Sequence, residues 1–274
     1  MEITLGLLIA VVIISLLAEY MDNSLGGGYG TTLTPVLLIM GFAPLAVVPA
    51  VLAGQLVGGV VGGYFHHRVG NIHLDFCHDE TDIKKKWRCL GYTPRSLDAK
   101  VVLILAVSGL IGGVIGAVSA INIPTIILSI YIGAMVLAIG ILLLVRRNHQ
   151  SPFSFRRLFG IGLLSAFNKG LSGGGYGPLI TGGQVLIGRG VRNAIGSATV
   201  AEVVVCIVAF LSFVFFKGGI YWTLAAATAI GSITAGPLGA ITVKKLAPNK
   251  LKIGMGLFTI VLGALTLGKV FIFS

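Results

Sequence analysis

Long apolar stretches, separated by short polar segments, dominate the pattern of hydrophobic and polar positions along the chain. Residues 23–67 and 101–145 contain no Asp, Glu, Lys or Arg, and each is long enough for about two membrane-spanning helices. Further charge-free stretches cover residues 3–18, 170–188, 203–216, 218–243 and 253–268. The pattern predicts an all-α integral membrane protein with about 8 to 10 transmembrane or re-entrant helices.

The composition excludes a soluble or a disordered protein. Hydrophobic residues occupy 55% of the 274 positions and charged residues only 11%, whereas soluble domains carry about 25% charged residues. In a soluble protein, the formal net charge of +11 would suggest a nucleic-acid partner. Here the basic residues stand in short segments between apolar stretches, which is typical of the cytoplasmic loops of membrane proteins. We therefore expect membrane lipids around the chain and no nucleic-acid partner.

The chain contains an internal repeat. The sequence Gly-Gly-Gly-Tyr-Gly occurs at residues 26–30 and again at residues 173–177, an offset of 147 positions. Beyond the polar segment 66–100, which the second half lacks, further matches continue at an offset of 123. An ordered series of matches with a single length change predicts two homologous halves, residues 1–145 (with the cytoplasmic loop 66–100) and residues 146–274.

The positions of Lys and Arg predict how the chain crosses the membrane. The loops 66–100, 146–157, 189–192 and 244–252 contain most of the basic residues, so we place these loops in the cytoplasm. Counting crossings from there puts both termini outside, with the first half starting outside and the second half starting inside. Inverted repeats of this kind are common in secondary transporters. The chain is expected to be a multi-pass protein of the cytoplasmic (inner) membrane.

Each half has an apolar segment that is interrupted by a run of glycines. Consecutive glycines end a helix, and irregular backbone inside a membrane needs protein or a water-filled cavity around it. A helix restarting after each break would point free N–H groups and its positive dipole end at the break, where they can bind an anion. The alternative is that the glycines only permit helices to cross closely. The residues predicted to bind substrate at the breaks are Gly26, Gly27, Gly28, Tyr29, Gly30, Thr31, Ser172, Gly173, Gly174, Gly175, Tyr176 and Gly177.

Four ionisable residues lie within or beside the apolar stretches: Glu19, Asp22, Lys169 and Glu202. Charged groups are costly in lipid and are functional by default. Asp22 and Lys169 stand at equivalent positions, four residues before each glycine triplet, and Gln55 corresponds to Glu202 at the same offset of 147. We expect Lys169 to contact the substrate anion, and Asp22, Glu202 and Gln55 to carry a proton or a counter-charge. The alternative is a structural ion pair between the halves.

The loop 66–100 contains histidines and cysteines, among them His73, Cys77, His78 and Cys89. Their spacing matches none of the usual zinc patterns, so we expect no metal and no cofactor. The basic residues of the loop are instead expected to lie near anionic lipid headgroups.

The glycine motifs and their surroundings resemble those of a known family of transporters. The sequence Ser-Leu-Gly-Gly-Gly-Tyr-Gly at residues 24–30, followed by Pro35, has a copy at residues 172–178, and Ala-Ile-Gly-Ser follows at residues 194–197. These segments are similar to those of the TauE/SafE family of sulfite and organosulfonate exporters. The resemblance implies two homologous halves and the transport of a small sulfur-containing anion.

We therefore expect a secondary transporter that exports a small anion, such as sulfite or a short organosulfonate. The anion would be held near the membrane midplane by two glycine-rich helix N-termini and a lysine. An anion channel is the alternative. A membrane-embedded enzyme is a more distant one, because the sequence gathers no recognisable nucleophile, acid–base pair or metal motif. The chain is thus not expected to be an enzyme, and assembly into a homo-oligomer stays open.

Overall fold

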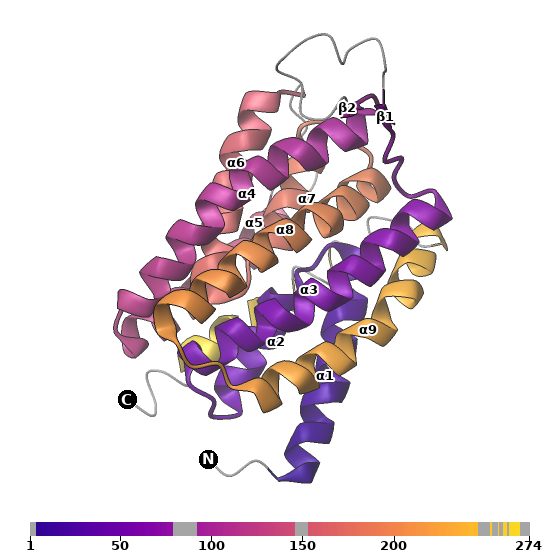
Figure 1. Cartoon of the computed structure of the whole chain (residues 1–274). Helices are drawn as coiled ribbons and strands as arrows, with labels where there is room; N and C mark the ends of the chain where they lie inside the picture. The colour runs from indigo at the N-terminus through magenta and orange to yellow at the C-terminus, as the bar shows by residue number, and fades with distance from the viewer. Residues whose placement is uncertain are drawn as a thin grey trace.

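The computed structural model describes residues 4–78, 92–145, 153–245, 253, 257, 260–261 and 263–268. Within these residues the protein is built almost wholly from helices, five of which are long and apolar enough to span a membrane: α1, α3, α4, α8 and α9 (Figure 1). The prediction of an all-α integral membrane protein is confirmed. The helices are α1 (Leu5–Leu25), α2 (Tyr29–Ile39), α3 (Pro44–Val69), α4 (Leu97–Asn122), α5 (Thr125–Val145), α6 (Phe155–Ser172), α7 (Tyr176–Leu186), α8 (Val191–Lys217) and α9 (Trp222–Lys245).

Part of the predicted loop 66–100 folds as a β-hairpin. Strand β1 (Phe76–His78) pairs with β2 (Tyr92–Pro94) in an antiparallel arrangement that sets Cys77 opposite Thr93. Strands of three residues are too short to produce a recognisable alternation of polar and apolar positions, so the sequence pattern did not indicate them. Cys89 and the two chain termini lie outside the described residues.

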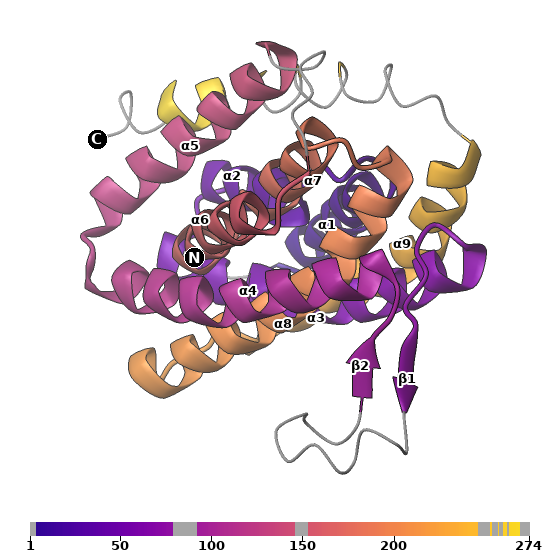
Figure 2. The same cartoon turned by 90° about the horizontal axis from the view of Figure 1, so that it is seen from above.

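Four long helices form a layer in the order α4, α8, α3, α9 (Figure 1). Helix α1 packs on α9, and α6 packs on α4. Seen from above, the short helices α2 and α7 lie with α1 and α6 between this layer and α5 (Figure 2). The first helix of each predicted half thus packs on the fourth helix of the other half. A two-fold relation between residues 1–145 and 146–274 would produce this exchange.

Small residues line the closest helix crossings. Gly112 and Gly116 of α4 lie directly against the backbone of α6, and Gly231 of α9 lies against the backbone of α1 at Val12. Without a hydrophobic driving force in lipid, membrane helices associate through such close packing. This explains why so many glycines occur in helices that are otherwise apolar.

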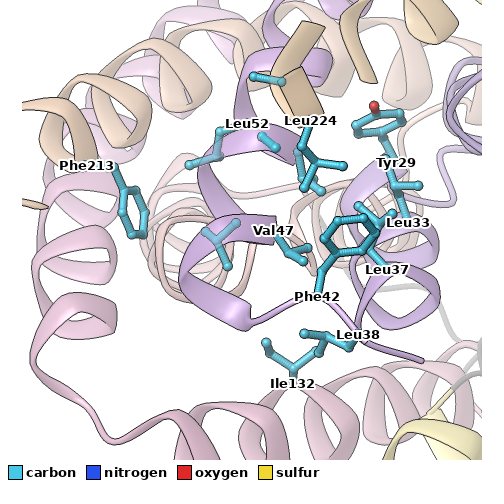
Figure 3. Close-up of a cluster of buried hydrophobic side chains, with 14 of the residues drawn as sticks. Tyr29, Leu33, Leu37, Leu38, Phe42, Val47, Leu52, Ile132, Phe213 and Leu224 are labelled. Atoms are coloured by element: carbon cyan, nitrogen blue, oxygen red, sulfur yellow. The ribbon is translucent and has the colours of Figure 1, made fainter. Parts of the chain in front are cut away.

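The short helix α2 is enclosed by protein on nearly all sides. Its side chains Leu33, Leu37 and Leu38 belong to a buried cluster that includes Val47 of α3 and Leu224 of α9 (Figure 3). With only 11 residues, α2 is too short to span a membrane. Its burial therefore holds the start of α2, and with it the first glycine break, inside the protein.

The basic loops lie at one end of the helix layer. Arg192 Nη2 donates a hydrogen bond to the Lys244 carbonyl oxygen at 2.9 Å, and Lys244 Nζ lies 3.5 Å from the Val69 carbonyl oxygen. At the opposite end, Lys217 Nζ donates to the Leu45 carbonyl oxygen at 2.5 Å. We call the end that contains Val69, Arg192 and Lys244 the basic end. The described parts of the loops that the Lys and Arg pattern assigns to one side of the membrane thus lie together.

Candidate substrate site

The two glycine breaks have positive φ angles at equivalent positions. Gly26 (φ 64°) ends α1 and Gly173 (φ 74°) ends α6, and each caps its helix by donating its N–H to a carbonyl four residues earlier. Two residues further on, Gly28 (φ 78°) and Gly175 (φ 81°) also have positive φ angles. Side chains with a β-carbon are strained in this region of φ, whereas glycine is not. The repeated glycines thus allow each chain to turn sharply and begin a second helix at Tyr29 or Tyr176.

The breaks from the two halves lie in direct contact. The Gly175 N–H donates to Thr31 Oγ1 at 2.9 Å. A β-carbon at Gly30 would overlap the Gly173 carbonyl group, and one at Gly174 would overlap the backbone of Gly30 and Thr31. The N-termini of α2 and α7 therefore converge, as a pair of inverted broken helices should. The same contacts show that these glycines also serve a close backbone crossing.

An aspartate of the chain itself occupies the N-terminus of α2. The Gly28 N–H donates to Asp22 Oδ1 at 2.8 Å, and Gln55 Nε2 donates to Asp22 Oδ2 at 2.8 Å. A carboxylate at this place is stabilised by the positive end of the helix dipole. A substrate anion at the start of α2 would therefore meet a negative charge.

The equivalent positions of the second half hold a buried ion pair. Lys169 Nζ lies 2.7 Å from Glu202 Oε1, and the exposed fractions of the two side chains are 0% and 1%. Apart from this pairing, Nζ has no hydrogen-bond partner among the described residues. The structure thus joins the predicted residues within each half, Asp22 with Gln55 and Lys169 with Glu202.

The tyrosines and the serine of the breaks differ in their partners. Tyr29 OH lies 2.7 Å from Ser15 Oγ of α1 and also donates to the Thr228 carbonyl oxygen of α9. Its hydroxyl group is therefore already hydrogen-bonded within the protein. Ser172 Oγ accepts from the Gly174 N–H at 3.1 Å and stabilises the turn. Tyr176 OH is buried without a partner among the described residues. Of these three candidates, Tyr176 retains a hydroxyl that a ligand could use.

Two threonines that sequence reasoning did not include face the opposite break. A β-carbon at Gly173 would touch Thr34 Oγ1 at 3.0 Å, and one at Gly26 would touch Thr181 Oγ1 at 2.5 Å. Both hydroxyls are buried, and neither has a hydrogen-bond partner in the described part of the chain. Thr34 and Thr181 are related by the offset of 147, which is the signal that could have identified them.

The crossing of the breaks is closed in this structure. Asp22, Gln55, Lys169 and Glu202 are each at most 2% exposed. Buried polar groups with unused hydrogen-bonding capacity therefore surround the crossing, but a solute would reach them only after the helices rearrange.

A network at the basic end joins α4 to the start of α8. Arg189 pairs with Asp98 and donates to Gln184, and Asn193 Nδ2 donates to Asp98 Oδ2 at 3.1 Å. Burial lowers the pKa of the Arg189 guanidinium, and the Asp98 carboxylate opposes that shift. Arg189, Asp98 and Asn193 also line a pocket of about 430 Å³ together with His73 and Phe153.

Comparison with known proteins places this architecture in a family. The family described as "Sulfite exporter TauE/SafE" matches residues 88–266, well over half of the chain. The chain belongs to the TauE/SafE family. It is also similar to "Probable membrane transporter protein YtnM" of Bacillus subtilis (strain 168), with 26% identity over an alignment covering 95% of this chain and 82% of that protein. This TauE/SafE protein is therefore a multi-pass membrane transporter. The family match contains Lys169 and Glu202, whereas Asp22 and Gln55 precede it.

Proposed function

We propose that the chain is a secondary transporter that exports a small sulfur-containing anion, sulfite or a short organosulfonate, across the cytoplasmic membrane. The family and the similarity to a probable membrane transporter support the class of protein, and the description of the family supports the substrate. The observation that carries the proposal is the Lys169 ammonium group. It is wholly buried beside a glycine break, and it has N–H donors beyond the one directed at Glu202.

The groups around the crossing suit the oxygens of such an anion. These oxygens accept hydrogen bonds, and the free hydroxyls of Thr34, Thr181 and Tyr176 can donate them. Lys169 supplies a positive charge, and the N-terminus of α7 adds the positive end of a helix dipole. Because Asp22 already occupies the N-terminus of α2, the anion is proposed to bind on the α7 side of the crossing.

The proposal is tested by measuring anion efflux from proteoliposomes that contain the purified protein. Vesicles are loaded with sulfite, sulfate, ethanesulfonate, acetate or chloride, and efflux is followed by ion chromatography, with protein-free vesicles as control. We expect saturable efflux of sulfite or ethanesulfonate, accelerated by the same anion outside, because a transporter exchanges its substrate. Efflux that neither saturates nor responds to external anion would instead indicate a channel. Efflux of none of the five anions by folded protein would overturn the anion proposal.

The orientation in the membrane leads to a separate prediction. The basic end is expected to face the cytoplasm, because Lys and Arg are enriched in cytoplasmic loops. In a variant without native cysteines, Asp75→Cys lies on the basic end and Gly219→Cys on the opposite end, and both positions are exposed. A membrane-impermeant thiol reagent added to intact cells should label the Gly219→Cys protein and not the Asp75→Cys protein. The reverse result would invert the orientation.

A further inference from the structure

We propose that Glu19 is a proton-binding site that couples anion transport to proton movement, and that Asn23 and His66 connect it to the basic end. This inference rests on the proposed function, because it requires the protein to move an anion. It concerns a buried carboxyl group of α1 that faces Gly58 of α3 and Ser232 of α9.

Glu19 is a fully buried carboxyl group with a single side-chain partner. Its Oε1 accepts a hydrogen bond from Asn23 Nδ2 at 2.7 Å, and its Oε2 has no partner in the described part of the chain. The groups that α3 and α9 place against it are uncharged: a β-carbon at Gly58 would touch both the Glu19 carboxyl group and Ser232. Among the described residues, Glu19 makes no ion pair.

The charged and titratable groups near Glu19 do not neutralise it. Asp22 on the same helix and Glu202 on α8 are acidic, and Tyr29 on α2 bears a neutral hydroxyl. Lys169 on α6 is already paired with Glu202 at 2.7 Å. The buried centre thus contains three carboxyl groups and a single ammonium group among the described residues.

The other two carboxyl groups have partners that stabilise a negative charge. Asp22 accepts hydrogen bonds from the Gly28 N–H and from Gln55, and Glu202 faces Lys169. Glu19 has only one neutral amide. An unpaired carboxylate inside a membrane protein costs several kcal/mol, so Glu19 is the group that needs a cation. The neighbouring Asn23 Oδ1 is also without a partner among the described residues. One carboxyl group and one amide oxygen provide too few ligands for a metal ion. A proton needs no further ligand, so we expect a proton to be the cation bound at Glu19.

Anion binding and proton binding at this centre reinforce each other. An anion that approaches Lys169 adds negative charge to a region that already carries an excess of carboxyl groups. A proton on Glu19 removes one of these charges and so favours the anion, and by linkage the anion favours the proton to the same extent. The two are therefore expected to move together.

A row of buried polar groups leads from Glu19 toward the basic end. Asn23 lies one turn of α1 beyond Glu19, and a β-carbon at Gly62 of α3 would touch its side chain; His66 lies one turn further along α3. Asn71 Nδ2 lies 3.0 Å from His66 Nδ1 and donates to the Ala240 carbonyl oxygen at 2.9 Å. Because the amide nitrogen can only donate, Nδ1 accepts and the ring hydrogen lies on Nε2. Chains of Glu and His within membrane segments are typical of proton relays.

The second half lacks this row although it has the same helix crossing. At the offset of 147, Glu19 corresponds to Ala166 and Asn23 to Gly170. A β-carbon at Gly112 of α4 would touch Ala166, and Gly170 lies against the backbone of Gly113. Small apolar residues thus close the equivalent crossing, so packing alone does not require Glu19 or Asn23.

The coupling is tested with proteoliposomes loaded with ethanesulfonate and a fluorescent pH indicator. Ethanesulfonate is the anion of a strong acid and carries no proton itself. We expect its efflux to make the lumen alkaline. Glu19→Gln should abolish this pH change while efflux continues, His66→Gln should slow it, and the control Asp75→Asn, which alters an exposed carboxylate, should leave it unchanged. Efflux without a pH change in the wild type, or an unaltered pH change in Glu19→Gln, would overturn the coupling and leave the anion transporter standing. Absence of efflux in the wild type would overturn the proposed function.

A second measurement does not depend on transport or on the folding of a variant. Dicyclohexylcarbodiimide modifies protonated carboxyl groups in apolar surroundings. In the wild-type protein we expect peptide mass spectrometry to find the modification at Glu19, and we expect Na⁺ to protect no better than K⁺. An unmodified Glu19 would contradict the proposal. Specific protection by Na⁺ would show that a metal ion binds there in place of the proton.

Discussion

Replacing Gly30 by alanine is expected to prevent the two halves of the protein from packing together. The new β-carbon would overlap the Gly173 carbonyl group and approach the α-carbon of Gly174. Overpacking a core costs about 1–3 kcal/mol when side chains can adjust. Here both neighbours are backbone at the start or end of a helix, so relief would require α2 and α7 to separate. We expect loss of the monodisperse peak in size-exclusion chromatography, or a large drop in Tm.

A second glycine provides the matched control. Gly160 of α6 is exposed, and a β-carbon there would have no atom within 4 Å. Glycine inside a helix is less stable than alanine by about 0.5–1 kcal/mol, so Gly160→Ala should leave Tm unchanged or raise it slightly. A Gly30→Ala protein that behaves like Gly160→Ala would mean that the breaks do not cross as closely as described.

The sequence pattern predicted the fold class because hydropathy is a local property. Charge-free stretches indicated the spanning helices, and the glycine runs indicated where α1 and α6 end. The pattern predicted that both breaks serve one site near the membrane midplane. It could not predict that their backbones touch, because such contact depends on the rotation and depth of each helix. The pairing of β1 with β2 was not predicted for a different reason, since the two strands are too short to show a period.

The sequence selected the buried polar residues beside the breaks, but not how they pair. The sequence selects Asp22, Gln55, Lys169 and Glu202, and it leaves open a structural ion pair between the halves. The structure instead pairs Asp22 with Gln55 and Lys169 with Glu202. The offset of 147 relates these two pairs to each other, so one polar pair in each half could have been inferred. Nothing in the pattern indicated that Asp22 would cap α2. That contact can be recognised only when the position of the α2 N-terminus relative to Asp22 is known.

Glu19 shows what a linear pattern leaves out. The sequence identified it as one of four ionisable groups in the apolar stretches, but gave it no role. The role proposed for it rests on what surrounds it: uncharged neighbours on α3 and α9, and no ion-pair partner among the described residues. A sequence does not show which charged groups pair with each other, so a carboxyl group without a partner can be recognised only in the structure.

Replacing Lys169 by methionine is expected to destabilise the protein and to abolish anion transport. The substitution removes the ammonium group 2.7 Å from Glu202 and leaves a wholly buried carboxylate without its partner. Removing one member of a buried ion pair costs about 3–5 kcal/mol, so Tm should fall well below that of the wild type. Loss of efflux from this variant alone would therefore not separate a substrate contact from a structural ion pair.

The double variant Lys169→Met, Glu202→Gln separates the two roles. Removing both charges leaves no unpaired carboxylate, and replacing a buried ion pair by neutral side chains of similar volume is often close to neutral for stability. We expect Tm to recover while sulfite or ethanesulfonate efflux stays absent, because no other residue of the crossing supplies a positive charge in the described part of the chain. Recovery of efflux together with Tm would show that Lys169 only balances Glu202. The anion would then have to bind through the helix N-terminus and hydroxyl groups alone.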